Sequence, residues 1–345
     1  MRSFLNLDNY DFLLPRELIA SKPSEVRGNS RLLVLEREIK DRTIDNLVDY
    51  LDSGDLLVIN DTKVLKARLK GKRSTGGSVE VFIERINKNN NVQAQVRSNR
   101  KIQKGDLIYI EGSQVELKVL EKKGYLNKVK FSIDPRKVLE DFGKVPLPPY
   151  IQREATDLDK ERYQTIYADE DKKNSVAAPT AGLHFNQTQI KDIRNKGIKI
   201  VKITLDIGLG TFMPIKSNII EDHEMHTEKI HLNEGAIEEI NKAKHSNSKV
   251  IAVGTTSLRC LESVHNKFGE LRPYEGETNL YIYPGYKFKV VDSLFTNFHL
   301  PKSSLFLLVC AFGGTTEMKK AYSHAIKKGY KFFSYGDAML INKKQ

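Results

Sequence analysis

The stretch KVIAVGTTSLRCLESV, residues 249–264, predicts a strand, a tight turn and a helix in direct succession. The aliphatic run VIAV is typical of a buried strand, and GTTS supplies the turn before the helical segment. A strand that leads at once into a helix is the repeating unit of an α/β layer with parallel pairing. The stretch therefore predicts an α/β fold.

Neighbouring segments repeat this alternation of helices and strands. Residues 186–197, NQTQIKDIRNKG, begin with Asn186 and Gln189 at capping-box spacing, which predicts a short helix. Residues 198–208 alternate apolar with polar side chains and predict a strand. Residues 303–314, SSLFLLVCAFGG, fit either a buried strand or a helix; the serine at the start and the two glycines at the end favour the helix.

Residues 62–145 differ from the rest and predict an inserted domain. GGSVEVFIERI, NVQAQVRS, GDLIYIEG, QVELKVLEKKG and NKVKFSI alternate with period two and are separated by turn residues. Such runs predict an antiparallel sheet that closes into a small β-barrel. We therefore expect a layered α/β main domain, residues 1–61 plus 146–345, interrupted by this barrel. The proline-rich KVPLPPYI at the end of the insert predicts an extended linker.

The positive charge of the chain is concentrated in this insert. The whole chain of 345 residues carries 56 Lys and Arg against 44 Asp and Glu, a net charge of +12. Residues 62–145 hold 20 of the basic and 9 of the acidic residues, a net of +11, so the remainder carries +1. This segregation predicts contact with nucleic acid or phosphate, although a solvated barrel surface is the alternative.

Other features exclude several classes of protein. No apolar run approaches the length of a membrane span, and the first residues lack the pattern of a secretory signal. Cys260 and Cys310 lie far apart in apolar surroundings, without zinc-ligand spacing, which predicts buried, reduced thiols in a cytosolic protein. GLGTF lacks the third glycine of a dinucleotide fingerprint, so a nicotinamide-binding domain is unsupported.

Three turns rich in Gly and Thr follow predicted strands, at residues 178–185, 206–212 and 253–259. Ligands of α/β sheets bind at the carboxyl ends of strands, where turns and helix N-termini expose unpaired amides. Each turn taken alone can equally be a helix cap.

Residues 222–231, DHEMHTEKIH, contain three histidines and several acids. They fit metal binding, proton transfer or a polar surface turn, but not the H-E-x-x-H order of a zinc site. Asn297, His299 and Asp337 stand among apolar residues, where they need either a ligand or structural partners.

Taken together, these motifs resemble one family closely. LPRELIASKPSEVRGNSRLLVL, GDLLVINDTKVLKARL, SVAAPTAGLHF, GLGTFMPI, HEMHTE, IAVGTTSLRCLES, TNFHLPKSSL and SYGDAMLI are similar to the S-adenosylmethionine:tRNA ribosyltransferase-isomerase family of queuosine biosynthesis. The resemblance runs from Asp11 to Ile341 in the family's order. One departure is Asp206, where the family commonly has His.

The resemblance implies a reaction in which S-adenosylmethionine donates ribose rather than methyl. The ribose moiety passes to the aminomethyl group of 7-aminomethyl-7-deazaguanine at the tRNA wobble position, and adenine and methionine leave as epoxyqueuosine forms. The implied route removes a proton from ribose C5′, expels adenine, lets the amine attack C4′ and closes the epoxide as methionine leaves. This chemistry calls for a base and an acid, and for no metal or redox cofactor.

The matched motifs supply the candidate site residues. For proton transfer they are His184, His226 and Glu228. For S-adenosylmethionine they are Thr180, Gly182, Gly208, Gly210, Thr211, Thr255, Thr256, Asn297, His299 and Asp337. For tRNA they are Arg27, Arg31, Lys63, Arg68, Arg153 and Arg162. We also expect a cytoplasmic monomer without membrane attachment.

Two other functions remain open at this stage. A non-catalytic RNA-binding protein would use the basic barrel but would not need three ligand-type turns. An ordinary tRNA methyltransferase would also consume S-adenosylmethionine, but the chain lacks a Gly-rich first strand–turn–helix.

Overall fold

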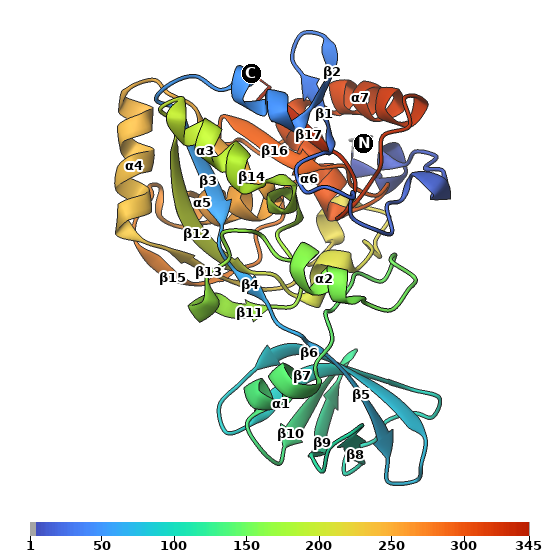
Figure 1. The fold of residues 1–345 in the computed structure, drawn as a ribbon. Coiled ribbons are helices and arrows are strands. Elements are labelled where there is room, and N and C mark those ends of the chain that lie inside the picture. The colour runs from blue at the N-terminus through green and yellow to red at the C-terminus, as the bar shows by residue number, and fades with distance from the viewer. Residues whose placement is uncertain (1–4, 345) are drawn as a thin grey trace.

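The computed structural model describes residues 5–344 and contains one large mixed sheet, one closed barrel and a two-stranded sheet (Figure 1). The large sheet has nine strands in the order β15-β13-β12-β3-β14-β16-β17-β1-β2. Their bounds are β1 Arg31–Leu35, β2 Ile39–Thr43, β3 Leu56–Asn60, β12 Lys199–Asp206, β13 Glu228–Leu232, β14 Val250–Val253, β15 Tyr274–Thr278, β16 Ser293–Asn297 and β17 Ala338–Asn342.

The centre of the sheet is parallel, as the alternation of strands and helices predicts. Strands β12, β3, β14 and β16 are parallel neighbours, and β1 pairs parallel with β17; the remaining neighbours are antiparallel. Every residue of β3, β14 and β16 is buried, because helices cover both faces of a parallel sheet. The parallel strands end at one edge, and the loops that follow them build the site.

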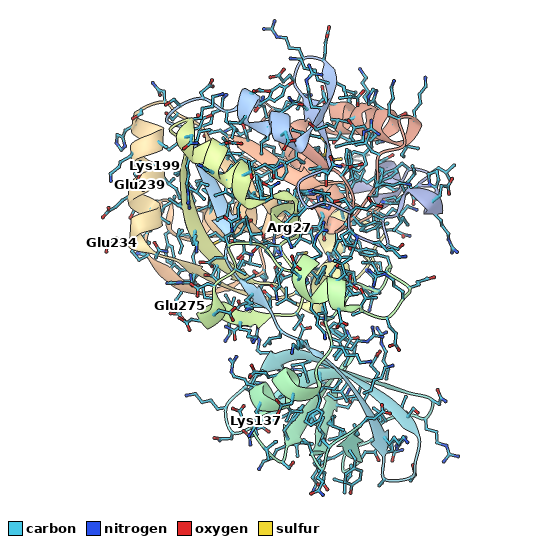
Figure 2. All side chains as sticks on the ribbon, viewed as in Figure 1. Arg27, Lys137, Lys199, Glu234, Glu239 and Glu275 are labelled. Atoms are coloured by element: carbon cyan, nitrogen blue, oxygen red, sulfur yellow. The ribbon has the colours of Figure 1, made fainter. Side chains whose placement is uncertain are left out.

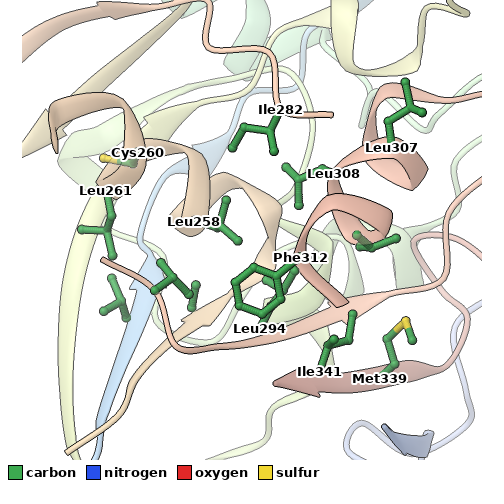
Figure 3. Close-up of a cluster of buried hydrophobic side chains, with 14 of the residues drawn as sticks. Leu258, Cys260, Leu261, Ile282, Leu294, Leu307, Leu308, Phe312, Met339 and Ile341 are labelled. Carbon is green, nitrogen blue, oxygen red and sulfur yellow. The ribbon is translucent and has the colours of Figure 1, made fainter. Parts of the chain in front are cut away.

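Helices lie on both faces of this sheet. Buried residues of α4, α5, α6 and α7 form one core with one face, and those of α3 and the 3₁₀-helix η4 pack on the other. Figure 3 shows part of the first core, where Leu258 and Leu261 meet Leu294, Leu308 and Phe312. The helices are α2 Asp157–Arg162, α3 Gln187–Asn195, α4 Glu234–His245, α5 Gly254–Phe268, α6 Ser304–Gly313 and α7 Thr315–Lys327. The 3₁₀-helices are η2 Leu7–Tyr10, η3 Arg16–Leu18, η4 Ile44–Tyr50, η5 Glu170–Lys172, η6 Thr180–His184, η7 Leu209–Phe212 and η8 Ile220–Asp222.

The local signals of the sequence are confirmed. Asn186 and Gln189 form the capping box of α3. The ambiguous segment is the helix α6. Ser303 caps its first turn, because Ser303 Oγ accepts a hydrogen bond from Phe306 N at 3.1 Å. Both cysteines are buried and unpaired. Within residues 5–344, no helix is long and apolar enough to cross a membrane.

The inserted segment forms a closed antiparallel barrel at one end of the molecule, in the order β10-β7-β6-β5-β8-β9 (Figure 1). Its strands are β5 Arg68–Arg73, β6 Ser78–Ile86, β7 Asn91–Ser98, β8 Leu107–Ile110, β9 Glu116–Lys123 and β10 Leu126–Phe131, and the helix α1 Pro135–Phe142 follows them. The sequence pattern identified five of these strands and missed β5, RLKGKR, because only Leu69 is an apolar side chain there. The division of the chain at residues 62 and 145 remains our prediction.

The segment that leaves the barrel packs on the main body of the protein. Val145, Leu147 and Ile151 join a small core with Tyr163 and Leu183. Two strands, β4 Lys63–Val64 and β11 Lys173–Ser175, pair beside the point where the chain enters the barrel. The proline-rich linker is therefore anchored, and it is not extended throughout, because Ile151 N donates to Pro148 O at 2.9 Å and closes a turn.

Candidate active site

A cavity of about 390 Å³ lies at the carboxyl ends of β12, β14 and β16, and we call it the main cavity. Loops following these three strands converge there because parallel strands end at the same edge. Six of the ten residues predicted for S-adenosylmethionine line it: Thr180, Thr211, Thr255, Thr256, Asn297 and His299. The structure thus brings the three Gly/Thr turns of the sequence together.

The N-terminus of α5 faces the main cavity. Gly254, the first residue of α5, has a φ of +86°, a left-handed conformation that a side chain would strain. Thr255 and Thr256 follow in the first helical turn, where backbone N–H groups lack intrahelical partners. Thr256 Oγ1 is buried and has no hydrogen-bond partner within residues 5–344. These donors and the helix dipole favour an anionic group at this end of the cavity.

Aromatic rings form another wall of the main cavity. Tyr150 stacks on Phe333 with ring centroids 4.1 Å apart, and Phe212 lies 6.1 Å from Tyr150. Phe333 has a φ of +74°, a strained conformation for a residue with a side chain, of a kind that gathers at ligand sites. Burial raises the pKa of Tyr150, so its hydroxyl stays neutral beside Ser334, its hydrogen-bond partner. The wall offers a flat surface to a planar ring.

His184 lies behind the cavity wall rather than in it. Its ring is 4% exposed, Nδ1 is 2.9 Å from Ser30 Oγ, and Nε2 is 2.9 Å from Asn297 Nδ2. Asn297 in turn donates to the carbonyl oxygen of Phe333 and accepts from Thr180 Oγ1 at 3.0 Å. Because the carbonyl of Phe333 needs a donor, the atom of Asn297 that faces it is the amide nitrogen Nδ2. The same Nδ2 donates to Nε2 of His184, so Nδ1 of His184 carries the proton and donates to Ser30 Oγ.

Burial explains why His184 and His299 are both neutral. Desolvation lowers the pKa of His184 to about 4 and that of His299 to about 3. His299 Nε2 pairs with Thr296 Oγ1 at 3.1 Å. A neutral His184 with both nitrogens bonded is suited to hold Asn297 against the cavity.

The other four predicted S-adenosylmethionine residues lie outside the main cavity. Asp337 accepts from the backbone N–H groups of Arg31 and Lys331, at 2.8 and 2.7 Å, and so fastens the start of β1 to the chain before β17. Gly182 lies under Tyr167, whose hydroxyl a Cβ would overlap. Gly208 and Gly210 permit the close approach of Glu84 and His226 in the same way. These glycines are explained by packing, which a sequence motif does not distinguish from ligand contact.

Glu228, Arg259 and His226 form a buried cluster beside Thr211. Glu228 Oε2 makes an ion pair with Arg259 Nη1, and Oε1 lies 3.2 Å from His226 Nε2. Thr211 Oγ1 donates to the same oxygen at 3.3 Å. Burial alone would raise the pKa of Glu228, but the charges of Arg259 and His226 outweigh it and lower this pKa to about 2. The carboxylate is therefore ionised and holds the imidazole in place.

The sequence missed Arg259 and Glu84. A signal existed for Arg259, because it is the one cation in the apolar helical segment SLRCLESV. Glu84 belongs to the barrel strand β6, yet its Oε2 accepts from Leu209 N at 2.9 Å in the turn beside the site. Burial raises the pKa of Glu84. Nothing local in β6 marks this residue, since it is one of several polar residues of an alternating strand.

A metal centre does not form at the histidine-rich segment. Within residues 5–344, no three His, Cys, Asp or Glu side chains are grouped so as to hold a metal ion. His223 packs against the ring of Tyr281, and His231 lies opposite Thr204 in the sheet, apart from His226. Of the three histidines in this segment, His226 is the one that contacts the buried carboxylate of Glu228.

All six residues predicted for tRNA are engaged with their own chain. Arg153 makes a bidentate ion pair with the buried Asp159, and Lys63 and Arg68 pair with Glu170 and Glu80. Three others donate to backbone carbonyls, and they are Arg27, Arg31 and Arg162. Arg27 lies on the main body, whereas Lys137 marks the barrel (Figure 2). These contacts hold the six side chains in place, and the three arginines that donate to neutral carbonyls keep their positive charge.

Exposed lysines on β9 and β10 remain unpaired. Within residues 5–344 no ion pair involves Lys122, Lys123 or Lys128. Lys118 lies directly opposite Lys130 in the pairing of β9 with β10, and both are exposed. Like charges placed opposite each other are destabilising, and a phosphate would relieve their repulsion.

Comparison with known proteins gives a consistent result. A family model described as "Queuosine biosynthesis protein" matches residues 7–341. The chain is 46% identical to the S-adenosylmethionine:tRNA ribosyltransferase-isomerase of Francisella tularensis subsp. novicida, covering 98% of this chain and 100% of that protein. A protein of the same name from Francisella philomiragia is 44% identical with the same coverage. The crystal structure of S-adenosylmethionine tRNA ribosyltransferase from Thermotoga maritima matches with a TM-score of 0.56 and 31% identity, over 96% of this chain and 99% of that one.

Proposed function

The chain belongs to the family of queuosine biosynthesis proteins, and we propose on this premise that it is an S-adenosylmethionine:tRNA ribosyltransferase-isomerase. It is a transferase that moves and isomerises the ribose moiety of S-adenosylmethionine. The acceptor is 7-aminomethyl-7-deazaguanine at the tRNA wobble position, and the products are epoxyqueuosine-tRNA, adenine and methionine.

The observation that carries the site assignment is the main cavity, with an anion-binding helix end at one side and an aromatic wall at another. Its volume of about 390 Å³ suits a small-molecule ligand. We place the methionine carboxylate at the N-terminus of α5 and the adenine against Tyr150, Phe212 and Phe333. The aromatic faces and threonine hydroxyls then surround the cationic sulfur. Asn297 and Thr180 lie where they can bond the ribose hydroxyls.

Proton transfer falls to His226 in this proposal, with Glu228 as the fixed carboxylate that orients it. Glu228 is itself too strongly stabilised as an anion, by Arg259, to be the better proton carrier. His184 receives a positioning role instead of the acid–base role expected from the motif, because both its nitrogens are bonded within the protein.

The remaining expectations are kept as proposals. We propose that the exposed lysines of β9 and β10 carry more of the tRNA contact than the six basic residues of the matched motifs, which are bonded within their own chain. The reaction uses no metal and no redox cofactor, because each step moves a proton or an electron pair and the sulfonium acidifies ribose C5′. The enzyme acts as a cytoplasmic monomer.

The test incubates the protein with labelled S-adenosylmethionine and tRNA that carries 7-aminomethyl-7-deazaguanine. Release of adenine and methionine, with label retained on the tRNA, is the expected result. S-adenosylhomocysteine as the product would make the protein a methyltransferase, and tRNA binding without any product would make it an RNA-binding protein.

A further inference from the structure

A second cavity, of about 630 Å³, adjoins the main cavity and is not used by the placement of S-adenosylmethionine above. The two cavities share Met213 and Pro214 in their walls. His226, the proposed proton carrier, lines the second cavity and not the main one. Met213 and Pro214 thus border both cavities, and the proposed acid–base group lies on the side of the second one.

The polar groups of the second cavity fit a hydrogen-bonding heterocycle. Ser217 Oγ is a buried atom with no hydrogen-bond partner in the described part of the chain, whereas His226 Nε2 lies 3.2 Å from Glu228 Oε1. The exposed carboxylates of Asp222 and Glu224 also line the cavity, and within residues 5–344 neither forms an ion pair. Carboxylates accept from adjacent ring and exocyclic N–H groups, the donors that the Watson–Crick edge of a guanine-type base presents.

Rings are available for stacking on such a base. Tyr125 reaches this cavity from the turn between β9 and β10 of the barrel, and it is 45% exposed. His223 also lines the cavity and makes an edge contact with Tyr281. Aromatic side chains bind unstacked bases through their faces, and this interaction is typical of recognition of single-stranded loops.

The approach to the cavity carries positive charge. Lys122 and Lys123 lie three and two residues before Tyr125 at the end of β9, and Lys128 follows it on β10; all three are exposed. Lys216 lies in the cavity wall itself. A nucleotide that enters beside Tyr125 would thus have its backbone phosphates next to unpaired lysines.

We propose that the second cavity binds the 7-deazaguanine nucleobase of the tRNA, extruded from the anticodon stack. Asp222 and Glu224 accept from its N1–H and exocyclic amine, and Tyr125 stacks on its face. Its aminomethyl group then points past His226 towards the main cavity. This inference rests on the proposed function, since it assigns the acceptor subsite of that reaction.

The test uses two anticodon stem-loops that differ only at the wobble base, guanine or hypoxanthine, because hypoxanthine lacks the exocyclic amine. Fluorescence anisotropy at one fixed salt concentration measures both dissociation constants. The wild type should prefer the guanine loop by about tenfold, the size of a good paired contact to a base edge. The double variant Asp222→Asn/Glu224→Gln should lose this preference; retention of the preference, or its absence in the wild type, would overturn the proposal.

A stacking variant gives an independent readout. Tyr125→Leu should weaken binding of both loops by about tenfold, in line with the loss of one base–aromatic stack. The matched control Tyr50→Leu, in η4 beside Arg42, should leave both affinities unchanged. Equal effects of the two variants would refute the role of Tyr125.

The two proposals fail in different ways. S-adenosylmethionine affinity, measured by equilibrium dialysis, should be the same in wild type and all variants, which also shows that the variants fold. If the wild type releases adenine but discrimination survives in the double variant, only the base subsite is wrong. If the wild type releases no adenine with precursor tRNA, the proposed function is wrong.

Discussion

Substitution of His184 tests whether this residue positions Asn297 or carries a proton. His184→Ala removes hydrogen bonds to Ser30 and Asn297 and an edge contact with Phe295. Two bonds at about 1 kcal/mol each, plus the cavity left by the ring, give a loss of about 3 kcal/mol in the free energy of unfolding. His184→Gln keeps one bond, because its amide oxygen can occupy the place of Nε2 and accept from Asn297.

Turnover distinguishes the two roles. If His184 only positions Asn297, adenine release should fall about a hundredfold in His184→Ala, through misplacement of the cavity wall. His184→Gln should stay within about tenfold of the wild type, because Asn297 keeps its partner. Equal loss in both variants would show that His184 transfers protons and would refute the positioning role.

The pH dependence of stability gives a second measurement on the same variant. The pKa of His184 is about 4 in the folded state against 6.5 for the free side chain, so the unfolded state binds more protons between these values. Stability is therefore complete above pH 6.5 and falls on acidification. Between pH 7.5 and pH 5.5, protonation of His184 in the unfolded state should lower the free energy of unfolding by about 1.4 kcal/mol. Urea titrations should show this difference between wild type and His184→Gln; identical pH profiles would contradict the neutral, buried state.

Three further predictions concern the cluster, the turn and the basic residues. Glu228→Gln should destabilise the protein by about 3–5 kcal/mol in urea titrations, because Arg259 is left as an unpaired buried charge; the double variant Glu228→Gln/Arg259→Met should recover part of this, and no recovery would contradict the pairing. Gly210→Ala should displace the ring of His226 and lower adenine release about tenfold or more, with S-adenosylmethionine affinity unchanged; normal release would refute that packing. Arg153→Ala should lower Tm without altering the salt dependence of tRNA binding, and a shallower salt slope would show instead that it contacts the RNA.

Local signals in the chain predict most of the secondary-structure elements and their order. Capping of α3 by Asn186 and Gln189, the helical state of α6 and most barrel strands follow from signals within a few residues of each other. Motifs spread over the chain indicate the family. Counting the charged residues shows the positive charge of the insert. Six of the threonine, asparagine and histidine positions predicted for S-adenosylmethionine line one cavity, because the carboxyl ends of neighbouring parallel strands meet at one edge.

The contacts of each side chain at the cavity depend on long-range packing. His184 bonds partners 154 and 113 residues away, and Glu84 reaches Leu209 across 125 residues, so no local pattern records these contacts. Asp337 looked like a ligand residue, but the fold supplies its two backbone donors. A motif identifies which residue types meet at a strand end, whereas burial and long-range hydrogen bonds determine which of them face the cavity and which hold it in shape.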